Sequence, residues 1–129
     1  MRRTIDPFLD QFAAYDRWAR RLGLADSAFD SEAALREAAF APLRERGLVA
    51  AAWLERRGPD PRRLTYPERA PSLPDGGWIR VRTEPLGELE ARRADLRLGG
   101  EARSVVLVRR TRPAPGGARL RVTVAFTPP

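Results

Sequence analysis

The chain lacks cysteine, histidine and lysine, and each absence removes a class of chemistry. Without cysteine there is no disulfide, no thiolate zinc site and no cysteine nucleophile. Histidine and lysine are the usual bases near neutral pH, whereas arginine stays protonated, so no neighbour can activate a serine or threonine hydroxyl. The carboxylates Asp6 and Asp30 are interpreted as helix caps rather than as metal ligands. We therefore expect no enzyme, no metal site and no cofactor.

Long apolar runs are also missing. No segment approaches the roughly 20 apolar residues that are needed to span a bilayer. At the start of the chain, Asp6 and Asp10 interrupt the apolar run that a signal peptide would need. We expect a cytoplasmic protein with no membrane partner.

The abundant residue is arginine, which accounts for all 24 basic residues against 17 acidic ones, a net charge of +7. The excess is confined to one part of the chain. Residues 1–50 contain eight arginines and eight acidic residues, whereas residues 51–129 contain sixteen arginines and nine acidic residues. Such an imbalance favours an acidic partner, either nucleic acid or an acidic protein surface.

The length of 129 residues predicts a single domain, and its first part, residues 1–57, has the pattern of three helices. An Asp-Pro start and apolar residues at helical spacing predict the first helix over residues 6–23. A second is expected over residues 31–40. Pro42 begins the third, which carries Trp53 and ends at a glycine-proline pair near residue 57.

After Gly77 the apolar period changes from helical to alternating, which indicates strands. Four strands are predicted, separated by turns, over residues 78–84, 88–98, 102–111 and 118–126. The predicted fold class is therefore α+β, with three N-terminal helices packed on a four-stranded antiparallel meander sheet over residues 78–127. Ile79 and Val81 share one face with Thr83, as do the even-numbered residues from Leu120 to Phe126, and these faces should receive the helices.

The second predicted strand changes phase along its length. Leu89 and Ala91 stand at odd positions, whereas Leu96 and Leu98 stand at even ones. Because strand side chains alternate between faces, we expect a β-bulge near residues 92–93 that keeps both sets on the inner face.

Between the helices and the strands, residues 58–77 contain five prolines and few apolar residues. A segment of this length is unusual inside a compact domain, which predicts a stiff arm or binding loop, with a disordered tether as the alternative. As an arm, it would contact a partner through Leu64, Tyr66 and Leu73.

The outer face of the predicted sheet carries most of the candidate partner-binding residues. The sequence leaves three alternatives open for what this face contacts, namely nucleic acid, an acidic protein or solvent. Glu88 and Glu90 partly neutralise it, and the candidates are Trp78, Arg80, Arg82, Arg97, Arg119 and Arg121.

The run YPERAPSLPDGGWIRVRTEP, residues 66–85, resembles the entry segment of bacteriophage tail-terminator and related tail-completion proteins. The shared features are a YP element, prolines, a glycine before an aromatic residue, and then a basic alternating strand. The resemblance implies a ring-forming subunit at the end of a tail tube, and hence a virion component without catalysis.

The sequence thus predicts a non-enzymatic subunit of a larger assembly, such as a tail or head-tail completion protein. Its partners would be copies of itself or other subunits, because the apolar run Val105–Val108 would leave one face to be covered. The first alternative is a basic nucleic-acid-binding module that uses the arginine-rich face. The second is a small-ligand-binding domain with a nuclear-transport-factor-like pocket between Phe8, Phe12, Trp53 and the sheet.

Overall fold

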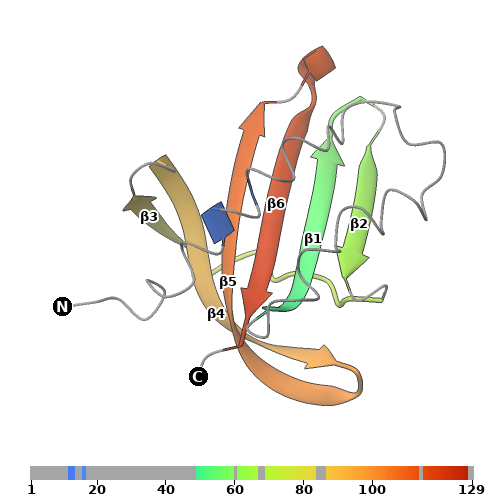
Figure 1. Ribbon diagram of the computed structural model, residues 1–129, viewed down its shortest axis with the longest axis vertical. Helices are drawn as coiled ribbons and strands as arrows, with labels where there is room; N and C mark the ends of the chain where they lie inside the picture. The colour runs from blue at the N-terminus through green and yellow to red at the C-terminus, as the bar shows by residue number, and fades with distance from the viewer. Residues whose placement is uncertain are drawn as a thin grey trace.

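The protein is built on one open, antiparallel six-stranded sheet (Figure 1). The computed structural model describes residues 12, 13, 16, 49–59, 61–66, 69–83, 87–113 and 115–127. The strands are β1 Val49–Arg57, β2 Arg62–Tyr66, β3 Ile79–Thr83, β4 Gly87–Leu98, β5 Glu101–Pro113 and β6 Arg119–Phe126. A short 3-10 turn, η1 Pro115–Gly117, joins β5 to β6.

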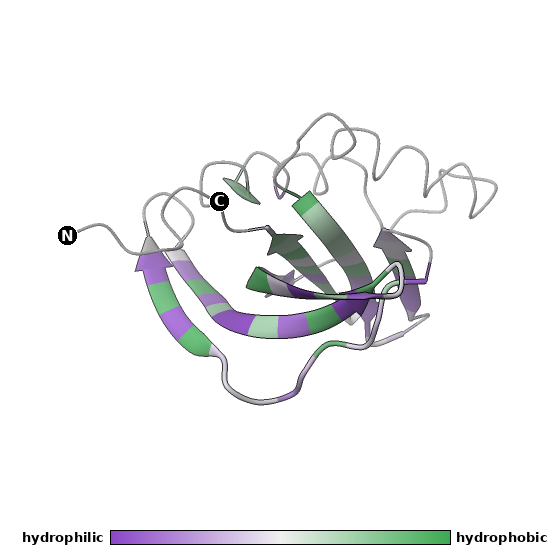
Figure 2. Cartoon of the chain, turned by 90° about the horizontal axis from the view of Figure 1, so that it is seen from below, coloured by the Kyte–Doolittle hydropathy of each residue, from purple (hydrophilic) through white to green (hydrophobic). Residues whose placement is uncertain are grey.

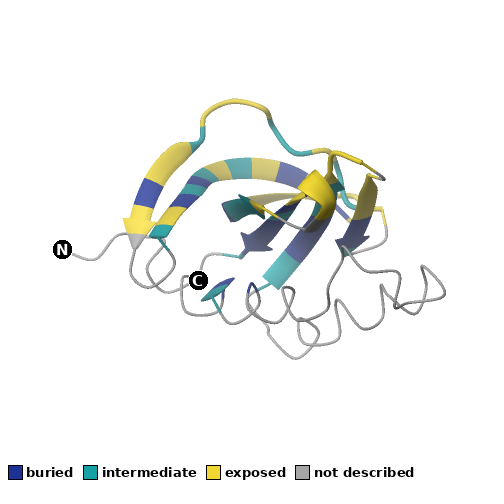
Figure 3. Cartoon of the chain, turned by 90° about the horizontal axis from the view of Figure 1, so that it is seen from above, coloured by how far each residue is buried: buried dark blue, intermediate teal, exposed yellow. Residues whose placement is uncertain are grey.

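The strand order is β2-β1-β6-β5-β4-β3. The four strands β3 to β6 form a meander, which confirms the strands predicted from the alternating pattern, and the hairpin of β1 and β2 extends the sheet beyond β6. The sheet is strongly curved (Figures 2 and 3). The long hairpin of β4 and β5 follows this curvature past the ends of the other strands (Figure 1).

The predicted α+β fold with three helices is wrong, because the described part of the chain is mostly β, with six antiparallel strands in one open sheet. The third predicted helix is corrected most directly, since residues 49–57 form β1. The first two predicted helices, over residues 6–23 and 31–40, lie outside the described residues except for Phe12, Ala13 and Asp16, which are helical.

Strand β1 is buried on both of its faces, which explains why its sequence was misleading. It lies between β2 and β6, and Ala51, Ala52, Trp53 and Leu54 are all buried. A strand covered on both sides has a continuous apolar run instead of an alternating one. Such a run, rich in alanine, matches the composition of a helix equally well.

The proline-rich segment is part of the domain. It contains β2, whose Leu64 pairs with Leu54 and is buried. We call residues 69–78 the strap. The strap crosses one face of the sheet from the β2 side to the β3 side, opposite the described helical residues (Figures 2 and 3). We call the sheet face that it crosses the strap face.

The strap face carries an apolar cluster beneath the strap. Directly paired residues of neighbouring strands share a face, so the register assigns the buried members of the cluster to this one side. Ala70, Leu73 and Trp78 pack against them. The buried members are Ala51, Trp53, Leu96, Leu98, Val105, Leu107 and Ala125.

The expected bulge in β4 is wrong. The register between β4 and β5 runs without interruption from Glu90 opposite Arg109 to Leu98 opposite Glu101. The phase change is therefore real. Leu89 is buried on the face opposite the strap, whereas Leu96 is buried on the strap face, so the two ends of β4 bury different faces.

The opposite face holds the second half of the core. Val81, the even-numbered residues of β6 and the even-numbered valines of β5 share it, as the alternating pattern predicted. Ile79 was predicted to be covered on the same face, but it is 67% exposed on the edge strand β3. Asp16 is fully buried against this face, where it forms ion pairs with Arg110 and Arg112 at 3.0 and 2.8 Å. On the strap face, Val105 and Leu107 of the apolar run in β5 belong to the cluster against which the strap packs, so this face of the run is covered within the chain.

Candidate functional site

The strap itself is fixed by hydrogen bonds to backbone carbonyls. The Trp53 indole Nε1 donates to the carbonyl of Pro71 at 3.0 Å, and the Trp78 Nε1 donates to the carbonyl of Pro74 at the same distance. The Arg92 guanidinium donates to the carbonyl of Gly76. An indole N–H that is removed from water needs a hydrogen-bond acceptor, and carbonyl groups of the strap provide one for each of the two tryptophans.

Beyond the strap, the strap face changes from apolar to basic. We call Arg57, Arg63, Arg119 and Arg121 the arginine field. They extend from β1, β2 and β6 around Glu55. The register pairs Glu55 with Arg63 and with Arg121, and Arg57 with Arg119. Four arginines and one glutamate give this field a formal charge of +3.

The arginines of the field form no ion pair with a carboxylate of the described part of the chain, although Glu55 stands opposite two of them. The ion pairs on the strap face belong to other residues, Arg80 with Glu88 at 3.9 Å and Arg109 with Glu90 at 3.1 Å. Like charges placed directly opposite one another, as Arg57 and Arg119 are, destabilise a sheet. Glu55 offsets part of this repulsion, and the remaining charge of +3 favours the binding of an anion.

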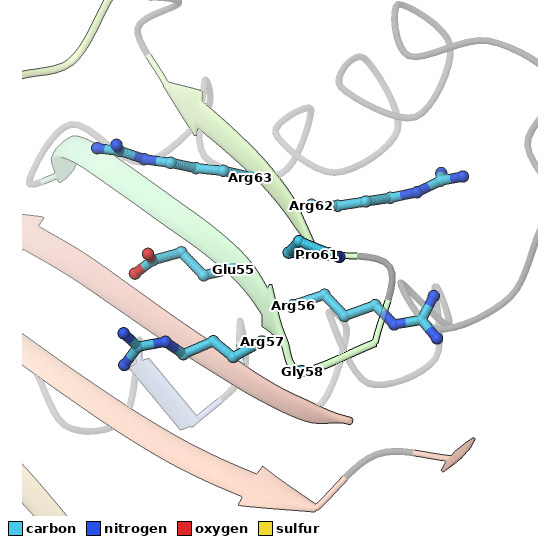
Figure 4. Close-up of a pocket in the computed structure, with 7 residues that line it drawn as sticks. All are labelled: Glu55, Arg56, Arg57, Gly58, Pro61, Arg62 and Arg63. Carbon is cyan, nitrogen blue, oxygen red and sulfur yellow. The ribbon is translucent and has the colours of Figure 1, made fainter. Parts of the chain in front are cut away.

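The end of the β1–β2 hairpin forms an open pocket of about 320 Å³ beside this field (Figure 4). Arg57, Arg63 and Glu55 extend from one side of the hairpin, and Arg56 and Arg62 extend from the other. The hairpin thus presents arginines on both of its faces. Arg56 and Arg62 are directly paired across the strands, as are Glu55 and Arg63.

A second cavity of about 320 Å³ lies at the bend of β4 and β5. Its polar lining is Arg92, Arg93, Asp95 and Ser104, and the Ser104 hydroxyl donates to Asp95 at 2.7 Å. This lining carries a net charge of only +1, and Arg92 and Asp95 are already bonded within the chain, so the arginine field is the better candidate site.

The predicted site residues separate into two groups. Leu64 is buried in the core, Tyr66 is half-buried at the end of β2, and Leu73, a residue of the strap, packs against the apolar cluster. Trp78 is half-buried against Arg109, at 3.8 Å from the ring centroid. Arg97 lies on the opposite face near the β4–β5 turn, where it donates to the carbonyl of Gly100.

Four of the predicted arginines do share the strap face. Arg80 and Arg82 are exposed on the edge strand β3, Arg119 is exposed on β6, and Arg121 is half-buried beside it. Sequence reasoning missed Arg57 and Arg63, because it placed them at the end of a helix and in an arm. Their adjacency to Arg119 and Arg121 depends on pairing between strands that are distant in sequence.

The ligand pocket proposed between Phe12 and Trp53 has its two walls on different sides of the sheet. Trp53 lies on the strap face, whereas Asp16, which follows Phe12, binds Arg110 and Arg112 on the opposite face. Phe8 lies outside the described residues.

Among the described residues, no cluster of three or more potential metal-ligating side chains is found, and no helix has the length and hydropathy to cross a membrane. No family model, no curated protein and no solved structure matches the chain. The resemblance of residues 66–85 to tail-terminator proteins therefore stays a prediction.

Proposed function

We propose that this chain is a non-catalytic nucleic-acid-binding module, which holds the phosphate backbone through the arginine field. The observation that carries the proposal is that four arginines lie together on one face without a carboxylate partner among the described residues. Guanidinium groups suit phosphate oxygens, and each phosphate that they neutralise releases a counterion.

The binding mode follows from the aromatic residues. Single-strand binders usually stack bases on exposed aromatic rings. Trp78 is the candidate on this face, but Arg109 already covers its ring and Pro74 accepts its N–H. Contacts to phosphates, which carry no sequence information, are therefore the expected mode.

The assembly subunit predicted from the sequence is the second candidate. Its two main supports, the proline arm and the two-sided apolar run of β5, now have partners within the chain. One observation still favours it. Ile79 is 67% exposed on β3, an edge strand of the sheet, next to the exposed Arg80.

The test is oligonucleotide binding as a function of salt. Fluorescence anisotropy of a labelled 20-nucleotide strand and of its duplex would be measured between about 50 and 300 mM NaCl for the wild type and two triple variants. The field variant changes Arg57, Arg63 and Arg119 to Gln. The control variant changes Arg93, Arg97 and Arg103, all exposed on β4 and β5, and removes the same charge.

We expect the field variant to flatten the slope of log affinity against log salt by about two to three units, since each lost phosphate contact contributes nearly one. The control variant should keep the wild-type slope. Equal losses in both variants would indicate attraction by net charge alone. No binding by the wild type, with loss of self-association in an Arg80 and Ile79 double variant, would favour the assembly candidate instead.

A further inference from the structure

Arg121 differs from the other arginines of the field because its orientation is fixed. It lies on β6 at the side of the arginine field that is nearer to the apolar cluster, and it is half-buried. Its Nε donates to the Thr111 hydroxyl at 2.9 Å. This bond holds the plane of the guanidinium and leaves the two terminal amino groups for another acceptor.

Arg109, its diagonal neighbour on β5, shows what a structural arginine on this face looks like. Its Nε and Nη2 donate to the two carboxylate oxygens of Glu90 at 3.1 and 3.3 Å, and its guanidinium covers Trp78. Its Nε, its Nη2 and one face of its guanidinium are thus all in use. Arg121 has no such carboxylate among the described residues, although Glu55 stands opposite it on β1.

The electrostatic surroundings of Arg121 disfavour its own charge. Burial lowers the pKa of its guanidinium, and repulsion from Arg109 and Arg57 lowers the pKa further. Glu55 and Glu90 act in the opposite direction. Burial and repulsion outweigh the attraction of these two carboxylates, and a cation in such surroundings is stabilised when a further anion arrives.

We propose that Arg121 is the anchor that binds a single phosphate group, with Arg57 and Arg119 as its flanking cations. This inference rests on the proposed nucleic-acid binding and specifies where the nucleic acid is held. A phosphate group suits the place because its several oxygens can accept from the Arg121 fork and from a neighbouring guanidinium together. Either an internal phosphodiester or a terminal 5′-phosphate supplies this chemistry.

The anchor should distinguish arginine from lysine, whereas the flanking positions should not. A lysine at position 121 is a point charge that cannot keep the Thr111 bond and present a planar fork at once. Arg119 is exposed and contributes mainly charge, so lysine can replace it. Arg121→Lys and Arg119→Lys therefore form a matched pair with identical net charge.

The experiment has two arms. The first follows the arginine Nε–Hε signals of the ¹⁵N-labelled wild type by NMR during titration with inorganic pyrophosphate. We expect a saturable shift of the Arg121 signal and an unchanged Arg109 signal, since Arg109 is already bound to Glu90. If the Arg121 signal shifted no more than the Arg109 signal, the anchor would be overturned. This measurement uses the wild type alone, so it does not depend on whether a variant folds.

The second arm measures binding of an oligonucleotide with and without a 5′-phosphate to the two lysine variants. Arg121→Lys should weaken binding about tenfold, and Arg119→Lys should leave it within about twofold. A dependence on the 5′-phosphate identifies a terminal group as the source, and its absence identifies an internal phosphodiester.

The two arms separate the anchor from the proposed function. Oligonucleotide binding that is equal in both lysine variants would overturn the anchor and leave nucleic-acid binding in place. A pyrophosphate shift at Arg121 without oligonucleotide binding would keep the anion site and overturn nucleic-acid binding. The absence of both responses would overturn both.

Discussion

The guanidinium of Arg109 lies 3.8 Å from the centroid of the Trp78 ring, so that one side chain of β5 joins the strap to the sheet. The same guanidinium binds Glu90 on the neighbouring strand β4. Glu90, Arg109 and Trp78 thus connect β4, β5 and the residue that precedes β3. This connection lies directly between the apolar cluster and the basic surface.

The first prediction concerns Trp78. Trp78→Leu should lower the free energy of unfolding by about 2 kcal/mol, because it removes the contact with Arg109 and part of the packing under the strap. Trp78→Phe keeps a ring over Arg109 and should cost about 1 kcal/mol, mainly the bond to the Pro74 carbonyl. Urea unfolding followed by circular dichroism measures both. Equal stability of Trp78→Leu and the wild type would mean that the strap is not held by this residue.

The second prediction compares two adjacent glycines. Gly77 has a φ of +82°, and a Cβ there would lie 2.9 Å from Nη1 of Arg92, whereas a Cβ at Gly76 would meet nothing within 4 Å. Gly77→Ala should therefore cost more than about 1 kcal/mol, since a side chain is strained at positive φ. Gly76→Ala is the matched control and should change stability by less than half as much. Similar thermal midpoints for the two variants would contradict this geometry.

The alternating pattern after Gly77 was sufficient to predict β3 to β6, their order and the turns that contain Gly99 and Gly100. In these strands one face is apolar over most of its length, so the local sequence records which side is buried. Strand β1 has no such contrast. Trp53 is buried on the strap face and Leu54 on the opposite face, so the local sequence shows no alternation from which a strand could be recognised.

The candidate site was predictable only in part, for the same reason. Arg119 and Arg121 alternate with Leu120 and Val122 in an amphipathic strand, and their outward position follows from that pattern. Arg57 and Arg63 join them because β1 pairs with both β2 and β6. Pairing between strands more than fifty residues apart depends on the whole fold, and the sequence around Arg57 has no alternation that would indicate it.

The third prediction tests the buried ion pairs of Asp16. Its carboxylate accepts bonds from Arg110 at 3.0 Å and from Arg112 at 2.8 Å, and it is fully buried. Asp16→Asn leaves the two guanidinium groups without their counter-ion and should cost about 3–5 kcal/mol of stability. Asp95→Asn, at an exposed position bonded to Ser104, is the control and should cost less than about 1 kcal/mol. Chemical denaturation of both variants would refute the assignment if the two losses were equal.

The fourth prediction is that Arg121 reduces the stability of the folded protein. Its pKa is lower in the folded protein than in the unfolded chain, because of burial and then of repulsion from Arg109 and Arg57. The folded state therefore binds this proton less tightly. The resulting penalty is fully present at every pH well below the lowered pKa, and it disappears as the pH rises through that pKa towards the unfolded value, in strongly alkaline solution.

Arg121→Gln should accordingly raise the free energy of unfolding slightly, by less than about 0.5 kcal/mol because solvent screens this partly exposed charge, and by the same amount at pH 6 and pH 9. Glutamine can still donate to Thr111, so the change removes charge with little loss of bonding. Arg103→Gln, at an exposed position of β5, should leave stability unchanged. Pyrophosphate should raise the thermal midpoint of the wild type and of Arg103→Gln but not that of Arg121→Gln, because a ligand stabilises the form that binds it. If Arg121→Gln instead lost more than about 1 kcal/mol, the side chain would be holding the sheet together, and its unpaired charge would not be evidence for a bound anion.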